Sequence, residues 1–310
     1  MSIMAQHATE EPKTNRATVS RPLAIGMVLM VGVLLGLVYA PLLVWLGATS
    51  FKVEQLQTGG VLVLFAIVIC MRDTISSLRI EPNLNTQGLA LFFLGMAFLS
   101  FAGKYQHWVL PMYLLSFCLS FAAIISFLFG KLGVRQFLPA LGGFLVFGIL
   151  AGSFPALDWP LREVAAKHSG AFLSWLGVQV QVAYVPARPP ELLLATHGQI
   201  FVVATECNGF GLLTSSLLLA TILGFQYRLA AIRKLGLFAF AIPAAIIFNF
   251  LRIAAICMIA PRFPKTSYDF IHETVGTILY LAGLAIVWYA AGEFVDKAKA
   301  ESGKRQVLRS

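Results

Sequence analysis

Long apolar runs separated by short polar stretches dominate this sequence. A helix that crosses a bilayer needs about 20 apolar residues, within a range of roughly 17–25. We identify eight runs of about this length, which predicts an all-α polytopic membrane protein with about eight transmembrane helices. The predicted spans are residues 23–48, with a kink at Pro41, then 58–71, 88–103, 108–130, 136–153, 207–225, 235–260 and 272–292.

The same patterning predicts a single membrane domain, residues 23–292, with a polar tail at each end. Residues 1–22 lack an apolar core, so we interpret them as a disordered cytoplasmic tail and not as a cleaved signal. Residues 293–310 are charged, and we interpret them as a second cytoplasmic tail.

Residues 154–206 form the longest segment without a predicted span. Within it, residues 161–177 mix apolar and charged positions, which suits an amphipathic helix in the membrane interface or, equally, a short connector helix. Residues 178–182 alternate with period two, and residues 199–204 are a second β-rich run. Prolines break regular structure between them. We therefore expect a small outer-face β-hairpin with a long connection.

Composition agrees with the membrane class. The 310 residues are 58% hydrophobic and 12% charged, whereas soluble domains have about 45–50% apolar and about 25% charged residues. The net charge of +9 is explained by basic residues that flank membrane helices. Because the sequence has no basic face with interleaved aromatic residues, nucleic acid is not an expected partner.

Basic residues also predict the orientation. Eight spans place both termini on one side, and that side would carry 15 of the 23 Lys and Arg residues. The positive-inside rule therefore predicts cytoplasmic termini in the inner membrane, with membrane lipid around the helices. The segment 154–206 would then face the periplasm or exterior.

The four cysteines differ in their surroundings. Cys70, Cys118 and Cys257 lie inside apolar runs, where cysteine behaves as a small hydrophobe. Cys207 lies among polar residues at the start of a predicted span. No CxxC pair or Cys/His ligand spacing occurs, so we expect neither a metal site nor another cofactor.

Three reactive side chains meet at one membrane face in the predicted topology. Cys207 opens the sixth span and His272 opens the eighth, both at the outer face. Arg252 lies in the seventh span, about 13 Å from its outer end at 1.5 Å per residue. Since an arginine side chain can snorkel over part of that depth, we expect the three groups to share one site.

These residue types suit nucleophilic catalysis. A helix N-terminus and nearby cations lower the pKa of a thiol, which would make Cys207 a nucleophile. His272 would act as general base and then as general acid. The turn at Asn208-Gly209 would leave amide donors for an oxyanion. Arg252 would orient a substrate carbonyl or carboxylate, or stabilise the thiolate, since a charge within a span is costly and is functional by default.

Two further polar side chains are candidates for supporting roles. Asn249 precedes Arg252 by one turn and would hold its guanidinium. Glu206 would orient His272 or Arg252, or would simply face water. Each candidate also has a structural interpretation, because cysteine at a helix start and histidine at an interface are most often structural.

At these positions the chain resembles the exosortase/archaeosortase family of integral-membrane transpeptidases. The resemblance rests on the order Cys, Arg, His with similar gaps. It is carried by Glu206-Cys207-Asn208-Gly209 after Ile200-Phe201-Val202-Val203-Ala204, by Asn249-Phe250-Leu251-Arg252-Ile253, and by His272 with Gly276. The family commonly has a small residue or serine after the cysteine, whereas Asn208 follows it here.

The resemblance implies a sorting enzyme. Its substrates would be exported proteins with a C-terminal signal made of a short motif, a transmembrane helix and a basic cluster. Cys207 would form an acyl-enzyme, with His272 as acid/base and Arg252 as the third essential group, and an unidentified acceptor nucleophile would release the product. Bacterial members often accompany exopolysaccharide production.

Two other functional classes remain open from the sequence. In a small-anion transporter, Arg252 would bind the anion near the midplane; transporters commonly show internal repeats or paired broken helices, and we find no convincing repeat. In a non-catalytic scaffold for polysaccharide assembly, the same residues would persist without turnover.

Overall fold

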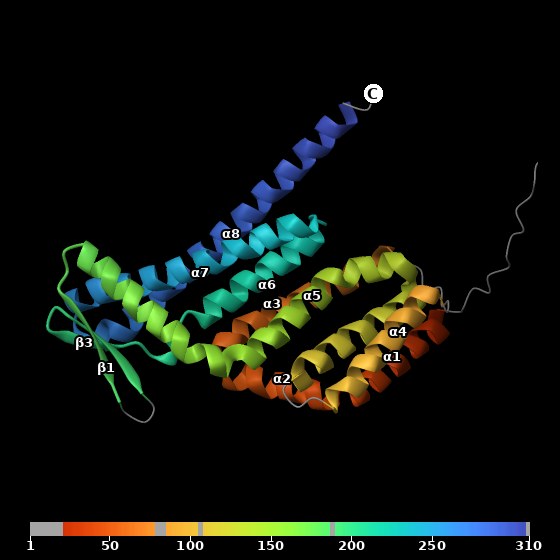
Figure 1. Cartoon of the computed structure of the whole chain (residues 1–310), viewed down its shortest axis with the longest axis horizontal. Helices are drawn as coiled ribbons and strands as arrows, with labels where there is room; N and C mark the ends of the chain where they lie inside the picture. The colour runs from red at the N-terminus through yellow and green to blue at the C-terminus, as the bar shows by residue number, and fades with distance from the viewer. Residues whose placement is uncertain (1–20, 78–84, 105–107, 187–189, 308–310) are drawn as a thin grey trace, which may run out of the picture.

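The computed structural model describes residues 21–77, 85–104, 108–186 and 190–307. Within these ranges the chain forms eight α-helices and one small antiparallel sheet, which lies at one end of an elongated helical bundle (Figure 1). We call this the sheet end. The predicted N-terminal tail lies outside the described residues, apart from its last two positions, which begin α1.

The helices follow the apolar runs of the sequence closely. All eight predicted spans fall within helices, or within helices and their adjoining turns. The α-helices are α1 (Arg21–Val38), α2 (Ala40–Lys52), α3 (Glu54–Ser77), α4 (Thr86–Ala102), α5 (Val109–Trp175), α6 (Phe210–Gln226), α7 (Ala231–Ile259) and α8 (Tyr268–Val307).

Length and apolar composition identify the chain as a membrane protein. Among the described residues, three helical segments are long and apolar enough to cross a bilayer, namely Val109–Trp175, Ala231–Arg262 and Tyr268–Lys297. The bent pair Leu29–Val38 and Ala40–Lys52 adds a fourth if it counts as one span. The segments Glu54–Cys70, Thr86–Ala102 and Phe210–Gln226 are apolar but shorter.

The predicted kink near Pro41 is confirmed. The axes of α1 and α2 differ by 76° across Tyr39, and Pro41 lies in the first turn of α2, where a missing N–H costs nothing. The buried Tyr39 hydroxyl lies 2.5 Å from Ser116 Oγ and 2.9 Å from Ser120 Oγ, so the bend is tied to α5.

Gly130 joins two predicted spans without a loop. Its backbone is non-helical, at φ 67° and ψ −163°, and residues on both sides are helical. Helix α5 therefore contains the predicted span 136–153 and all but the first residue of the span 108–130. A positive φ of this kind is accessible to glycine and strained for other residues.

The outer segment differs from its prediction, because α5 continues through residues 154–175. No separate amphipathic helix forms at 161–177. Ala165, Ala166 and Leu173 pack into a core with α7 and the sheet, so this stretch buries its apolar face against protein. Its pattern of apolar and charged positions does not distinguish a protein-covered face from a lipid-covered one.

The sheet has three strands, so the predicted two-stranded hairpin is corrected. Its strands are β1 (Val180–Val185), β2 (Glu191–Thr196) and β3 (Gln199–Val202), antiparallel in the order β1-β2-β3. Strand β2 was not predicted, although its sequence ELLLAT is apolar. His197 (φ 51°) and Gly198 (φ 73°) link β2 to β3, and positive φ at both central residues suits a tight hairpin turn.

One apolar core holds the sheet against the helices. It contains Leu192, Leu194, Phe201 and Val203 from the sheet side and Ile253, Ala254, Ile256 and Cys257 from α7. Cys207 and Val275 pack against this core. The sheet thereby fixes the strand that leads to Cys207 close to α7 and α8.

Helix α8 continues far beyond the predicted span 272–292. It runs to Val307 and projects from the bundle, as Figure 1 shows at its upper edge. Residues 293–307, which were predicted as a charged tail, are therefore helical.

Candidate active site

Cys207 and His272 lie in direct contact at the sheet end. The Sγ atom of Cys207 is 3.4 Å from Nε2 of His272, although 65 positions separate the two residues. Cys207 ends a short 3-10 turn, Thr205–Cys207, that follows β3, and His272 lies in the first turns of α8. A sulfur–nitrogen contact of this length is within hydrogen-bond range, so a proton can pass directly between thiol and imidazole.

A small pocket surrounds this pair. Cys207 and His272 line it together with Phe201, Val203 and Tyr268, and its cavity volume is about 20 Å³, which is room for about one water molecule. The Tyr268 ring stacks on the His272 ring with centroids 6.0 Å apart, which restricts the orientation of the imidazole. The pocket is therefore mainly apolar, with the thiol and the imidazole as its reactive groups.

Asn208 anchors the turn that carries the thiol. The side chain is buried, and its Nδ2 donates to Asp158 Oδ1 of α5 at 2.7 Å. Its Oδ1 accepts from the amide of Phe210 at 2.7 Å, which satisfies the first N–H of α6. One amide side chain thus joins the turn to two helices, so its position next to Cys207 is structurally specified.

Arg162 extends this network along α5. It forms an ion pair with Asp158, four residues earlier, and also donates to Thr205 Oγ1. Both partners of the ion pair are largely buried, with 14% and 19% of their side chains exposed. Asp158 and Arg162 therefore hold both Thr205 and Asn208, the residues on either side of the Glu206-Cys207 pair.

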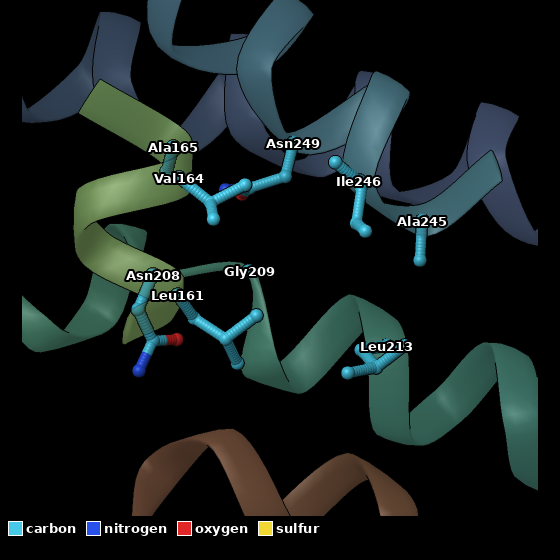
Figure 2. A pocket seen from close by; sticks show the side chains of 9 residues that line it. All are labelled: Leu161, Val164, Ala165, Asn208, Gly209, Leu213, Ala245, Ile246 and Asn249. Carbon is cyan, nitrogen blue, oxygen red and sulfur yellow. The ribbon is translucent and has the colours of Figure 1, made fainter. Parts of the chain in front are cut away.

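Gly209 and Asn249 hold the turn from the side of α7. The amide Nδ2 of Asn249 donates to the Cys207 carbonyl at 3.1 Å. Gly209 has φ 81°, and a Cβ there would lie 2.6 Å from Asn249 Cγ, so only glycine fits. A second, smaller pocket of about 10 Å³ is lined by Asn208, Gly209 and Asn249 among others. Figure 2 shows these residues between the ribbons of α5, α6 and α7.

Asn249 was expected to hold the guanidinium of Arg252, and the structure shows its Nδ2 bonded to the Cys207 carbonyl. Arg252 instead reaches α8. A Cβ added to Gly276 would lie 2.8 Å from Arg252 Nε and 2.9 Å from Nη2, so the absence of a side chain at Gly276 creates the space for the guanidinium. The Nε atom is buried and makes no hydrogen bond within the described part of the chain.

The structure thus brings Cys207 and His272 together directly and places Arg252 against α8 one turn further from its start, at Gly276. The side chain of Glu206 lies outside the described residues. Asp158, Arg162 and Thr205 were not predicted as site residues from the sequence. Their signal was the i,i+4 spacing of opposite charges, which predicts a helical ion pair but not its distant partners.

Across the described ranges, no cluster of three or more His, Cys, Asp or Glu side chains is arranged to hold a metal ion. The chemistry that the site offers through its described side chains is that of a thiol, an imidazole and a nearby guanidinium.

Comparison with known proteins identifies the family. No curated protein and no solved structure matches this chain. The family model described as transmembrane exosortase matches residues 51–289, which include the helices α3 to α7, the sheet and the first half of α8. The match contains the turn at Cys207, Arg252 and His272, and it covers more than half of the chain. The protein therefore belongs to the transmembrane exosortase family.

Proposed function

We propose that this protein is a cysteine-dependent membrane transpeptidase or peptidase that cleaves the C-terminal sorting signals of exported proteins. The observation that carries the proposal is the 3.4 Å contact between Cys207 Sγ and His272 Nε2. Family membership supports it, because exosortases are membrane transpeptidases that act on proteins with such signals. The signal would consist of a short motif, a transmembrane helix and a basic cluster.

In the proposed reaction, His272 removes the thiol proton and the Cys207 sulfur attacks a peptide carbonyl carbon. The C–N bond breaks, His272 returns the proton to the leaving amine, and a thioester remains on Cys207. An acceptor nucleophile, or water, then attacks the thioester. The Asn208 and Phe210 amides already donate to Thr205 O and Asn208 Oδ1, which leaves the Gly209 amide as candidate oxyanion donor.

Arg252 is the proposed third group. Its charge lies within an apolar helix, where an uncompensated cation is costly, and its buried Nε makes no hydrogen bond to the described residues. A guanidinium one helical turn along α8 from His272 supplies positive charge close to the reaction. In the proposal this charge favours the thiolate and orients the substrate carbonyl or carboxylate.

The Gly276→Ala variant tests the position of this guanidinium. The new Cβ would lie 2.8 Å from Nε, so the guanidinium must move, and this costs the fold little because it is the end of a flexible side chain. We expect processing of a sorted substrate to fall about tenfold to a hundredfold, while protein level and thermal stability remain close to those of the wild type. The measurement is the rate of substrate processing in membranes at matched protein levels.

The matched control is Gly292→Ala on the same helix, where a new Cβ meets nothing within 4 Å. Arg252→Lys keeps the charge but not the planar fork, and we expect it to be impaired as well. Full activity of both Gly276→Ala and Arg252→Lys would contradict a role for the guanidinium geometry.

The proposal includes a location. The excess of basic residues on the terminal side supports cytoplasmic tails, and the sheet end would then face the periplasm of a cell inner membrane. Exported substrates would reach the site from that side after translocation, and the product would be anchored at the cell surface. A link to exopolysaccharide production is part of the same proposal.

The covalent intermediate provides the direct test. A reporter protein that ends in a short motif, an apolar helix and a basic cluster is expressed with the enzyme, and membranes are analysed without reducing agent. We expect an adduct of enzyme and reporter that neutral hydroxylamine releases, because it cleaves thioesters. An adduct that persists in hydroxylamine, or one that forms equally in a Cys207→Ala variant, would oppose the proposed chemistry.

The transporter alternative gains little from the structure. A single bent helix pair occurs in the described ranges, α1–α2, and Tyr39 at its bend packs in a core that contains no residue of α7, the helix that carries Arg252. Transporters pair such breaks across two halves around the substrate. We therefore retain the transpeptidase as the proposed function.

A further inference from the structure

Strand β3 is an edge of the sheet and leads straight to the nucleophile. In the order β1-β2-β3 it has one strand neighbour, β2. The strand ends at Val202, and the 3-10 turn Thr205–Cys207 begins after two more residues. The open edge therefore ends next to the Cys207 thiol.

The register shows which backbone groups of β3 point away from β2. Val203 N donates to Leu192 O at 2.8 Å, so Val203 and Leu192 are a hydrogen-bonded pair. Because hydrogen-bonded and non-hydrogen-bonded pairs alternate in an antiparallel ladder, the N–H and C=O groups of Ile200 and Val202 face outward. Within the described ranges, neither residue makes a backbone hydrogen bond outside its strand pairing.

This edge borders the pocket of the candidate active site. Val202 lines that pocket together with Cys207 and His272. The side chains of Ile200 and Val202 are 68% and 50% exposed, so neither is covered by another element. An occupant of the edge would thus contact the pocket directly.

We propose that the open edge of β3 binds the scissile segment of the polypeptide substrate as an added β-strand. This inference rests on the proposed function and names how that site recognises its substrate. Backbone N–H and C=O groups of Ile200 and Val202 pair with the extended peptide and bring one of its carbonyls to Cys207. Main-chain pairing supplies affinity, and alternate side chains supply specificity.

The size of the pocket favours an extended occupant. A cavity of about 20 Å³ admits neither a helix nor a folded domain. An extended segment can present a single carbonyl to the thiol while its remaining residues stay on the open edge. The lining near β3 is apolar, with Phe201 and Val203 buried, so a peptide without charge at its innermost residue is the expected ligand.

The test replaces Val202 with proline, which has no backbone N–H to donate. A Val202→Pro exchange deletes an N–H that the sheet does not use, and proline is tolerated at such edge positions. We expect processing of the reporter described above to fall at least about tenfold through the lost pairing and the blocked edge. Alkylation of Cys207 by iodoacetamide should stay unchanged, which shows that the site is intact.

The matched control is Val182→Pro on β1, the opposite edge. The β1–β2 register places the backbone groups of Val182 outward as well, and we expect near wild-type processing. Equal processing by Val202→Pro and Val182→Pro would overturn the strand-addition proposal. If Cys207→Ala is inactive while Val202→Pro is fully active, the proposed function survives and only this inference fails.

Cross-linking provides a second measurement that does not depend on how proline is tolerated. Ile200→Cys is combined with Cys207→Ala and with reporters that carry one cysteine at successive positions of the motif segment. An added strand predicts disulfides at every second position, because alternate side chains share a face. Cross-links without this period, or none at any position, would overturn the proposal.

Discussion

Replacement of Cys207 by alanine is expected to abolish processing of sorted substrates while leaving the protein in the membrane. The Sγ atom is the group in contact with His272, and without it no thioester can form. Loss of a nucleophile from a coupled nucleophile–base pair costs on the order of 10⁴- to 10⁶-fold in rate. The measurement is the rate of reporter cleavage in membranes that contain equal amounts of each variant.

Cys257→Ala is the matched control, because this cysteine lines the same pocket and is buried on α7. We expect both Cys257→Ala and Cys118→Ala to process the reporter at about the wild-type rate. Cys207→Ser should also be inactive, since a neutral hydroxyl is a far weaker nucleophile than a thiol. Unchanged processing by Cys207→Ala would reject the nucleophile and favour the scaffold alternative.

The Asn208→Asp variant is expected to lose at least about a hundredfold in activity through displacement of the nucleophile. The present bond from Asn208 Nδ2 to Asp158 Oδ1 is 2.7 Å long, so the substitution would bring two carboxylates into contact. Loss of the bond and repulsion between the charges together destabilise the protein by about 2 kcal/mol. Processing rate and thermal unfolding measure the two effects.

Asp158→Asn should restore part of what Asn208→Asp removes, because it relieves the repulsion between the carboxylates but gives up the ion pair with Arg162. In the double variant the amide at residue 158 donates to the carboxylate at residue 208, which can still accept from the Phe210 amide. The matched control for the change on α5 is Glu163→Gln, because the Glu163–Lys167 pair is exposed. A double variant that is no better than Asn208→Asp alone would contradict the proposed role of this bond.

The helical part of the fold was largely readable from the sequence. An apolar run long enough for a bilayer is a strong signal, because backbone groups inside lipid must bond within the segment. The bend at Pro41 was readable for a similar reason, since proline fixes the local backbone. These features depend on residues close together in the chain.

Features that depend on tertiary contacts were missed. The sequence of strand β2 does not alternate between apolar and polar residues. Leu192 and Leu194 on one face are buried, and Leu193 on the other face is partly covered, so both faces carry leucine. The continuation of α5 through residues 154–175 does not follow from the apolar pattern, because charged residues interrupt that pattern and Pro155 and Pro160 lie inside the helix. The His197-Gly198 turn was a usable signal between two β-rich runs and was not used.

The candidate site was readable in part. The proximity of Cys207 and His272 followed from their positions at the starts of two predicted spans on one face. The contact of Asn208 with Asp158 did not, because it joins residues 50 positions apart and the sequence carries no local sign of it. The site of Arg252 beside Gly276 likewise depends on the packing of α7 against α8.

The position of His272 on the last helix has a consequence for biosynthesis. The ribosome releases α5, the sheet, α6 and α7 before it releases α8, so the nascent protein holds Cys207 for a time without its imidazole. The contact of its thiol with His272 forms only after α8 inserts and Gly276 docks beside Arg252. Under the proposed function, an incomplete chain would lack the general base, and peptide cleavage would begin only after α8 has inserted.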